Sequence, residues 1–452
     1  MASQLLIRAY DVGLGDCIYC RVPGVLQAGR RRDDLHILID CGSWSGMPFL
    51  TVALDRLAEA LPDAGDGLKR LDLVIATHEH KDHIAGFDPQ LFARFRIGHI
   101  WLSAAMDPKH PQAKKARALH DTAALAMRGL AAMGASLSPE LREFATLFGI
   151  DNAGAMKALR ETLPKANGIK PRYVHAGQTN DELGLVLKGA RITVLGPEQD
   201  IDRFYLGKEA DATLRGVAAL SARAPAASAG TAAVLPVATP ANIGGADFRR
   251  LRARMLSSAL AFATLSSKVT NNSSVVILIE WSGRRLLFVG DAEWDGAFRD
   301  QKSNGSWNVM WNQRHALLKA PIDFLKIGHH GSENATPWPQ DGLGADSEPA
   351  RILDAILPVP ISGKPRAKAV VSTTRGKYPT IPDAALMTEL GRRVASTKRY
   401  DRALAASGVD PGSVPKFAPY EKDWIGKPQP LRTDFERLID DRGYVELAID
   451  PG

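Results

Sequence analysis

The amino-acid sequence predicts a protein of the mixed α and β class. Short runs of apolar and β-branched residues recur near both ends of the chain, and their length and spacing indicate strands. Between these runs lie segments with helical spacing that are rich in good helix formers. The chain has 452 residues, of which 45% are hydrophobic and 24% charged, so we expect a large buried core rather than a disordered chain.

These signals place individual elements along the chain. The expected strands are Leu5–Tyr10, Cys17–Val22, His36–Asp40, Leu71–Ala76, Ile97–Leu102, Arg191–Leu195, Ser274–Glu280, Arg285–Val289, Phe324–Ile327 and Ala367–Ser372. The expected helices are Met47–Ala60, Ala113–Met133, Glu140–Leu147, Ala153–Leu163 and Asp383–Val394.

The organisation of the chain follows from shifts in composition. We expect a main domain over residues 1–400 and an irregular C-terminal extension over residues 401–452, which is rich in Pro and Gly. From about residue 108 to 166 the sequence has helical spacing and few strand signals, which predicts a helical insertion beside the active-site mouth. Residues 216–245 are rich in Ala, Ser, Pro and Gly, a composition typical of a flexible loop.

No segment of the sequence predicts insertion into a membrane. The longest apolar runs, such as Leu71–Ala76 and Val275–Ile279, are much shorter than the ~20 residues of a membrane helix. The first residues show no secretory signal, so we expect a soluble cytoplasmic protein. Only three cysteines occur, Cys17, Cys20 and Cys41, and we expect them to be buried thiols.

The segment LDLVIATHEHKDHIAGF carries the strongest chemical signal. A predicted strand runs directly into His78, His80, Asp82 and His83, so four side chains able to bind a metal fall within six residues. Alternation along an extended turn places His78 and His80 on one side, and the tighter turn that follows directs Asp82 and His83 toward a second position. Imidazole and carboxylate ligands suit zinc, with manganese or iron as alternatives. The pattern predicts two adjacent divalent metal ions.

This segment resembles the signature of the metallo-β-lactamase superfamily, whose fold is an αββα sandwich with the metals at one edge of the two sheets. Several other segments resemble the soluble metallo-hydrolase domain of ComEC-type competence proteins more closely than they resemble lactamases. They are DVGLGDCIYC, ILIDCGS, VHAGQ, ARITVLGPE, NNSSVVILIEWSGRRLLFVGDAE and FLKIGHHGS, and they occur in the order of that family. The resemblance covers most of residues 5–105, 170–200 and 268–400.

The resemblance implies further site residues. Asp291 falls on the aspartate that bridges the two metals in this superfamily, and either His329 or His330 is expected to complete the site. Where lactamases supply a third histidine to the first metal, this chain has Asn271–Ser273, which implies that one metal is weakly held. His175 is an alternative third ligand, although its place before a turn favours a surface role.

The resemblance and the charge together favour cleavage of phosphodiester bonds by metal-activated water. In the expected mechanism Asp82 and Asp291 orient the water and relay its proton, and Lys326 helps the metals to stabilise charge on a phosphoryl oxygen. The net charge of +7 suits nucleic acid as the substrate and partner. Two alternatives stay open: a hydrolase of small esters, lactones or thioesters, and a pseudo-enzyme that binds nucleic acid or a partner protein.

Overall fold

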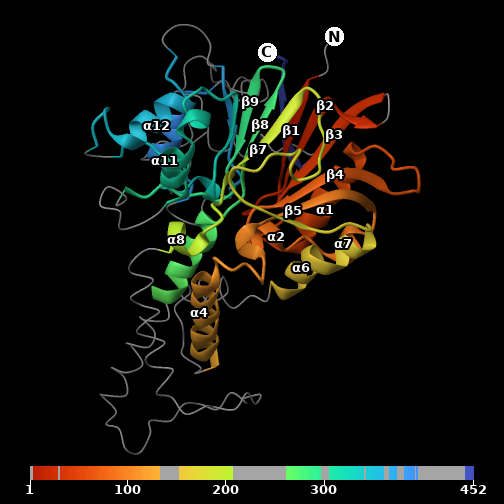
Figure 1. Ribbon diagram of the computed structural model, residues 1–452, viewed down its shortest axis with the longest axis horizontal. Helices are drawn as coiled ribbons and strands as arrows, with labels where there is room; N and C mark the ends of the chain where they lie inside the picture. Colours follow the sequence, from red (N-terminus) through yellow and green to blue (C-terminus); the bar gives the residue numbers. More distant parts are fainter. Residues whose placement is uncertain are drawn as a thin grey trace, which may run out of the picture.

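A computed structural model describes ten parts of the chain. They are residues 4–28, 31–132, 152–206, 261–296, 305–340, 343–360, 366–373, 381–391, 393–394 and 443–452. The described residues form two β-sheets that lie face to face, with helices on both outer sides (Figure 1).

The first sheet has seven strands in the order β12-β1-β2-β3-β4-β5-β6. Its strands are β1 (Leu5–Tyr10), β2 (Ile18–Ala28), β3 (Arg31–Ile39), β4 (Lys69–Ala76), β5 (Phe95–Ser103), β6 (Arg172–Val174) and β12 (Tyr444–Ile449). The second sheet has five strands in the order β11-β10-β9-β8-β7. Its strands are β7 (Ala190–Gly196), β8 (Val276–Trp281), β9 (Arg284–Phe288), β10 (Phe324–Lys326) and β11 (Lys368–Val370).

The described helices are mostly short, and most of them cover the outer faces of the sheets. They are α1 (Met47–Ala60), α2 (Lys81–Ile84), α3 (Pro89–Phe92), α4 (Lys114–Ala132), α6 (Ala153–Lys157), α7 (Leu163–Ala166), α8 (Ile201–Tyr205), α11 (Ser306–Leu318), α12 (Glu348–Ile356) and α13 (Ala384–Gly391). A π-helical turn, η2 (Ala158–Thr162), joins α6 to α7, and a further helix is described from residue 261 to 272.

Alternation of apolar residues along the strands produces four layers. In β8, Ile277 and Ile279 point into the core between the two sheets, whereas Val276 and Leu278 point into the outer core under α11 and α12. A separate outer core lies between the first sheet and α1. Because both faces of each sheet are apolar, each sheet needs a second sheet on one side and helices on the other. This arrangement confirms the predicted αββα sandwich.

Four parallel strands bring polar residues to one edge of the sandwich. Strands β3 and β4 pair in parallel in the first sheet, and β9 and β10 pair in parallel in the second. The carboxyl ends of parallel strands meet at the same edge of a sheet, and ligands commonly bind there. The segments that follow these four strands therefore form the natural place for a site.

Most of the predicted helices and strands are confirmed. The C-terminal extension, however, was expected to be irregular, and part of it forms a strand. Residues 444–449 form β12, which pairs antiparallel with β1 along its whole length. The Pro- and Gly-rich stretch before it concealed the alternating pattern of YVELAI in the sequence. The three cysteines are buried free thiols, as expected.

The predicted insertion, residues 108–166, divides into two parts in the structure. Its second part, α6 to α7, packs Met156, Leu159 and Leu163 into the outer core of the first sheet. Its first part, α4, projects away from the sheets beside α8 (Figure 1). The expected helix Glu140–Leu147, the loop at 216–245 and residues 401–442 lie outside the described residues.

None of the described helices is both long enough and apolar enough to cross a lipid bilayer.

The loop after β4 is held against the turn after β3 by backbone contacts. Cys41 N donates to His83 O at 2.8 Å, and Asp16 N donates to Asp82 O at 2.9 Å. Gly42 lies at the closest approach, where an added Cβ would stand 2.2 Å from both Asp82 C and His83 N. Only glycine fits here, because real Cβ atoms do not approach backbone so closely.

We predict that Gly42→Ala displaces the loop after β4 and lowers the free energy of unfolding by roughly 1–3 kcal/mol, because the backbone must move to admit the methyl group. Denaturant unfolding measures this change. Gly154→Ala is the matched control, since a Cβ at Gly154 would meet nothing within 4 Å. A Gly42→Ala variant as stable as the control would contradict the close packing.

Candidate metal centre

Four buried side chains converge where β4, β9 and β10 end. Asp82 and His83 belong to α2, Asp291 follows β9, and His330 follows β10. One potential ligand atom from each of the four lies within 4.8 Å of the others, and each residue is at most 5% exposed. Two carboxylates and two imidazoles at this spacing form a donor set suited to a divalent transition metal.

The imidazoles of this cluster are oriented by hydrogen bonds on their outer nitrogens. His83 Nδ1 donates to Asp40 Oδ2 at 2.8 Å, and His330 Nδ1 donates to the carbonyl oxygen of Ser372 at 2.8 Å. Both rings therefore present Nε2 to the cluster. Metal-binding histidines are usually oriented by such a bond to a carboxylate or a backbone carbonyl.

His78 and His80 lie beside the cluster. His78 Nδ1 is 3.1 Å from Thr77 Oγ1 and 3.2 Å from Ser274 Oγ, and its Nε2 is 3.0 Å from His80 Nδ1 and 3.8 Å from Asp291 Oδ2. Burial lowers the pKa of His80 to about 4 and lowers the pKa of His78 as well. Both imidazoles are therefore neutral at pH 7, as metal ligands must be.

Two buried atoms of the cluster support the fit to a metal. Asp82 Oδ1 and His83 Nε2 are buried and make no hydrogen bond with the described residues. His83 Nε2 lies 3.1 Å from Asp291 Oδ2, but without the alignment that a hydrogen bond requires. Unsatisfied polar atoms are costly in a protein interior, so two of them on clustered residues fit a site that takes up a cation.

Charges within the cluster shift its pKa values in complementary directions. Burial lowers the pKa of His83, but the carboxylates of Asp291 and Asp40 outweigh it and raise this pKa well above its usual range. Burial raises the pKa of Asp291, but His83 outweighs it and holds this pKa well below its usual range. The hydrogen bond to Asp82 likewise raises the pKa of His330 against the effect of burial. In the metal-free protein, protons on His83 and His330 thus balance the carboxylates, and a cation would replace them.

The backbone at the site is strained. Asp40, His329 and His330 have φ values of 58°, 41° and 52°, and among the described residues Ser282 is the only other non-glycine residue with positive φ. Such conformations cost about 1–3 kcal/mol each and cluster at functional sites. The strain at Asp40 accompanies three hydrogen bonds, because its carboxylate accepts from Thr77 N, Thr77 Oγ1 and His83 Nδ1.

The structure separates the two candidate histidines after β10. His330 lies in the cluster, whereas the ring of His329 turns toward Glu293 Oε1 at 3.3 Å and Ser332 Oγ at 2.9 Å. Asn271, one of the three residues at the expected third-histidine position, donates to Glu293 Oε1 at 2.7 Å. His175 hydrogen bonds to the backbone of its own turn and is not among the clustered residues.

Lys326 does not lie where the expected mechanism requires it. Its side chain is 2% exposed, and Nζ forms an ion pair with Asp16 Oδ2. Asp16 Oδ2 is in turn 3.9 Å from His83 Nδ1, on the side of that ring away from Asp82 and Asp291. Because its ammonium group is paired inside the protein, the structure does not bear out the prediction that Lys326 contacts a phosphoryl oxygen.

Sequence reasoning missed several residues that support the site. In the sequence, Asp16 is part of the DVGLGD segment and Ser274 begins a predicted strand, and neither pattern marks a site residue. Glu293, which contacts both His329 and Asn271, follows Asp291 by two residues. A charged residue inside an otherwise apolar or turn-forming segment was the available signal for Asp16 and Glu293.

Comparison with protein-family models identifies one match. The model of the metallo-beta-lactamase superfamily matches residues 28–123, which contain β4, α2 and the four residues His78, His80, Asp82 and His83. The sandwich architecture is consistent with that fold. The match implies a metal-dependent hydrolase, and the cluster provides its candidate metal site. A search of curated proteins found no match.

We predict that Lys326→Met lowers the free energy of unfolding by about 3–5 kcal/mol, because it leaves the carboxylate of Asp16 buried without its partner. Chemical denaturation of the metal-free protein measures this effect. The double variant Asp16→Asn/Lys326→Met should recover part of the loss, since both charges are then absent. If Lys326→Met were as stable as the wild type but had lower turnover, the result would instead support direct contact between Lys326 and the substrate.

Proposed function

We propose that this protein is a metal-dependent phosphodiesterase or nuclease that cleaves nucleic acid with metal-activated water. The observation that carries the proposal is the buried cluster of Asp82, His83, Asp291 and His330, with two of its polar atoms unsatisfied. The family-model match over residues 28–123 supports a metal-dependent hydrolase.

Two divalent cations are proposed to share Asp291. One would bind Asp82, His83, Asp291 and His330, whose donor atoms already converge. The other would bind His78 and His80, where Asn271–Ser273 stand in place of a third histidine. We therefore propose that the first cation is held more tightly than the second. Zinc suits this donor set best, and manganese is the second choice.

When bound, such cations lower the pKa of water toward ~7 and neutralise charge on the substrate. Hydrolysis of a diester forms a bond between the oxygen of water and phosphorus. The bond from phosphorus to the leaving oxygen breaks, and its electron pair departs with the leaving group. Asp82 and Asp291 orient the water and accept its proton, and the hydrogen bonds of Asp40 and Ser372 hold His83 and His330 in place.

Charge and sequence resemblance favour a phosphodiester over other bonds. The chain carries a net charge of +7, which attracts a polyanion. Lys114 and Lys115 are exposed at the start of α4, which also lines the cavity beside His78. The segments DVGLGDCIYC and FLKIGHHGS resemble those of ComEC-type domains. The sequence also has four closely spaced arginines, Arg249, Arg250, Arg252 and Arg254, which lie outside the described residues.

The same experiments also test two other candidate functions. A hydrolase of small esters, lactones or thioesters would use the same metal centre on an uncharged carbonyl substrate. A pseudo-enzyme would retain nucleic acid but would bind no metal. The buried donor cluster argues against the pseudo-enzyme, because a binding protein has no need of two unsatisfied polar atoms in its interior.

We predict one to two transition-metal ions per chain when the protein is purified without chelators. Asp291→Asn should reduce this content and abolish cleavage of DNA, RNA and bis(p-nitrophenyl) phosphate, because it removes a charge shared by both cations. Elemental analysis and product release measure the two effects. Asp66→Asn is the control, since this carboxylate lies at the surface, far from the cluster. Metal-free protein that gains no activity from zinc or manganese would defeat the proposal.

We predict that apparent affinity for DNA falls steeply as salt rises, because phosphate contacts with Lys and Arg release counterions. Turnover of a neutral aryl ester should show no such dependence. The measurement is cleavage of labelled single- and double-stranded DNA and RNA across a salt series. Cleavage of aryl esters without cleavage of any phosphodiester would favour the ester hydrolase.

A further inference from the structure

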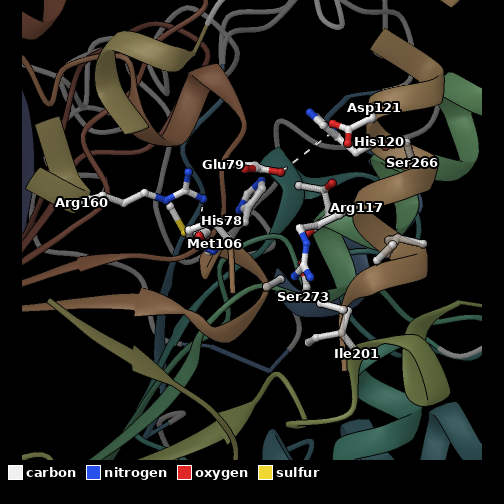
Figure 2. Close-up of a pocket in the computed structure, with 16 residues that line it drawn as sticks. His78, Glu79, Met106, Arg117, His120, Asp121, Arg160, Ile201, Ser266 and Ser273 are labelled. Atoms are coloured by element: carbon white, nitrogen blue, oxygen red, sulfur yellow. Dashed lines mark hydrogen bonds and ion pairs between the residues drawn. The ribbon is translucent and has the colours of Figure 1, made fainter. Parts of the chain in front are cut away.

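A cavity of about 260 Å³ opens beside the metal centre (Figure 2). His78 belongs to both places, because it lines the cavity and its Nε2 lies 3.8 Å from Asp291 Oδ2. Glu79, the next residue, also lines the cavity. A group attached to a phosphate at the metal centre would therefore extend into this space.

The cavity is built from segments that are far apart in the sequence. One wall comes from α4 and includes Arg117, His120 and Asp121, and a second wall comes from η2 through Arg160. Figure 2 shows Arg160 on the opposite side of His78 from these residues of α4. Ser266, on the helix at 261–272, stands behind His120, with its Oγ 3.5 Å from His120 Nδ1.

The lining is amphipathic and its charges balance. Met106, Ile201 and Val269 supply apolar surface. Two arginines, Arg117 and Arg160, and two carboxylates, those of Glu79 and Asp121, also line the cavity. Balanced charge does not suit a second phosphate, and it does suit an uncharged polar group with an apolar face.

Both arginines already have backbone partners. Arg117 donates to the carbonyl oxygens of Asp107 at 3.3 Å and of His110 at 2.8 Å, and Arg160 donates to that of Met106. These bonds fix the segment after β5 that forms part of the cavity wall. Glu79 Oε1 is 3.9 Å from His120 Nδ1. The exposed side chain of Asp121 lies beside His120 (Figure 2). The two carboxylates are therefore the natural acceptors for N–H and O–H groups of a ligand.

We propose that this cavity receives the single nucleoside attached to the scissile phosphate. The inference rests on the proposed function and specifies its substrate as a diester that carries one nucleoside beside the cleaved bond. The volume of the cavity is below the roughly 300–1,000 Å³ of pockets for drug-sized ligands, so the cavity holds one nucleoside rather than several. The sugar hydroxyl and base N–H groups meet Glu79 and Asp121, and the ring faces meet the apolar wall.

The test compares two diesters with the same leaving group. They are thymidine 5′-(p-nitrophenyl) phosphate and methyl p-nitrophenyl phosphate, which both release p-nitrophenol when water attacks phosphorus. The metal-loaded wild type should show kcat/KM at least about tenfold higher for the thymidine ester. In Ala116→Phe, where the new ring enters the cavity from α4, this preference should fall to about twofold or less.

Ala118→Phe is the matched control. Ala118 lies on the same helix, is exposed and does not line the cavity, so the preference should stay at the wild-type value. Asp121→Ala provides a second variant in case Ala116→Phe does not fold, because Asp121 is exposed. It should lower kcat/KM for the thymidine ester about fivefold, through loss of one hydrogen bond, relative to the methyl ester.

The outcomes separate the two proposals. Absence of metal-dependent cleavage of both diesters would defeat the proposed function. Cleavage of both at equal kcat/KM by the wild type would overturn the nucleoside cavity and leave the phosphodiesterase intact. A preference for the thymidine ester that survives in folded Ala116→Phe and in Asp121→Ala would also overturn it.

Discussion

The hydrogen bond between His83 Nδ1 and Asp40 Oδ2 is the interaction on which the site depends. It joins the end of β3 to the segment after β4, and Asp40 adopts a strained backbone to make it. The same carboxylate accepts from Thr77, directly before His78, so one side chain fixes both halves of the metal loop. The backbone bond from Cys41 N to His83 O repeats the connection. Rigid support of this kind is what keeps ligand atoms close before a cation arrives.

The buried carboxylates are balanced by two kinds of positive charge. Lys326 is a permanent partner for Asp16, since its ammonium group is enclosed and paired. The protons on His83 and His330 are exchangeable partners for the other carboxylates, because a cation can replace them. The ion pair between Lys326 and Asp16 stays in place when a cation replaces the protons on His83 and His330. The cluster can therefore exchange protons for a metal without losing this ion pair.

Local patterns in the sequence predicted the mixed α and β class and the metal loop, whereas the αββα sandwich was implied by the family resemblance. His78, His80, Asp82 and His83 lie within six residues, and the strand lengths follow from runs of apolar residues. Asp291 and His330 came from resemblance, since a single carboxylate or a histidine pair after a strand has no specific local pattern. The pairing of Lys326 with Asp16 could not be predicted, because 310 residues separate them. The cavity beside His78 likewise depends on how distant helices meet.

Strand β12 is synthesised long after β1, the strand with which it pairs. It pairs with β1, so the first sheet contains the earliest and the latest described segments of the chain. A ribosome adds roughly 5–20 residues per second, so β1 waits some tens of seconds for its neighbour. During synthesis the outer edge of β1 has unpaired backbone groups, which can pair with other chains. Completion of this sheet is therefore a late event, and until then the edge of β1 can aggregate with other chains.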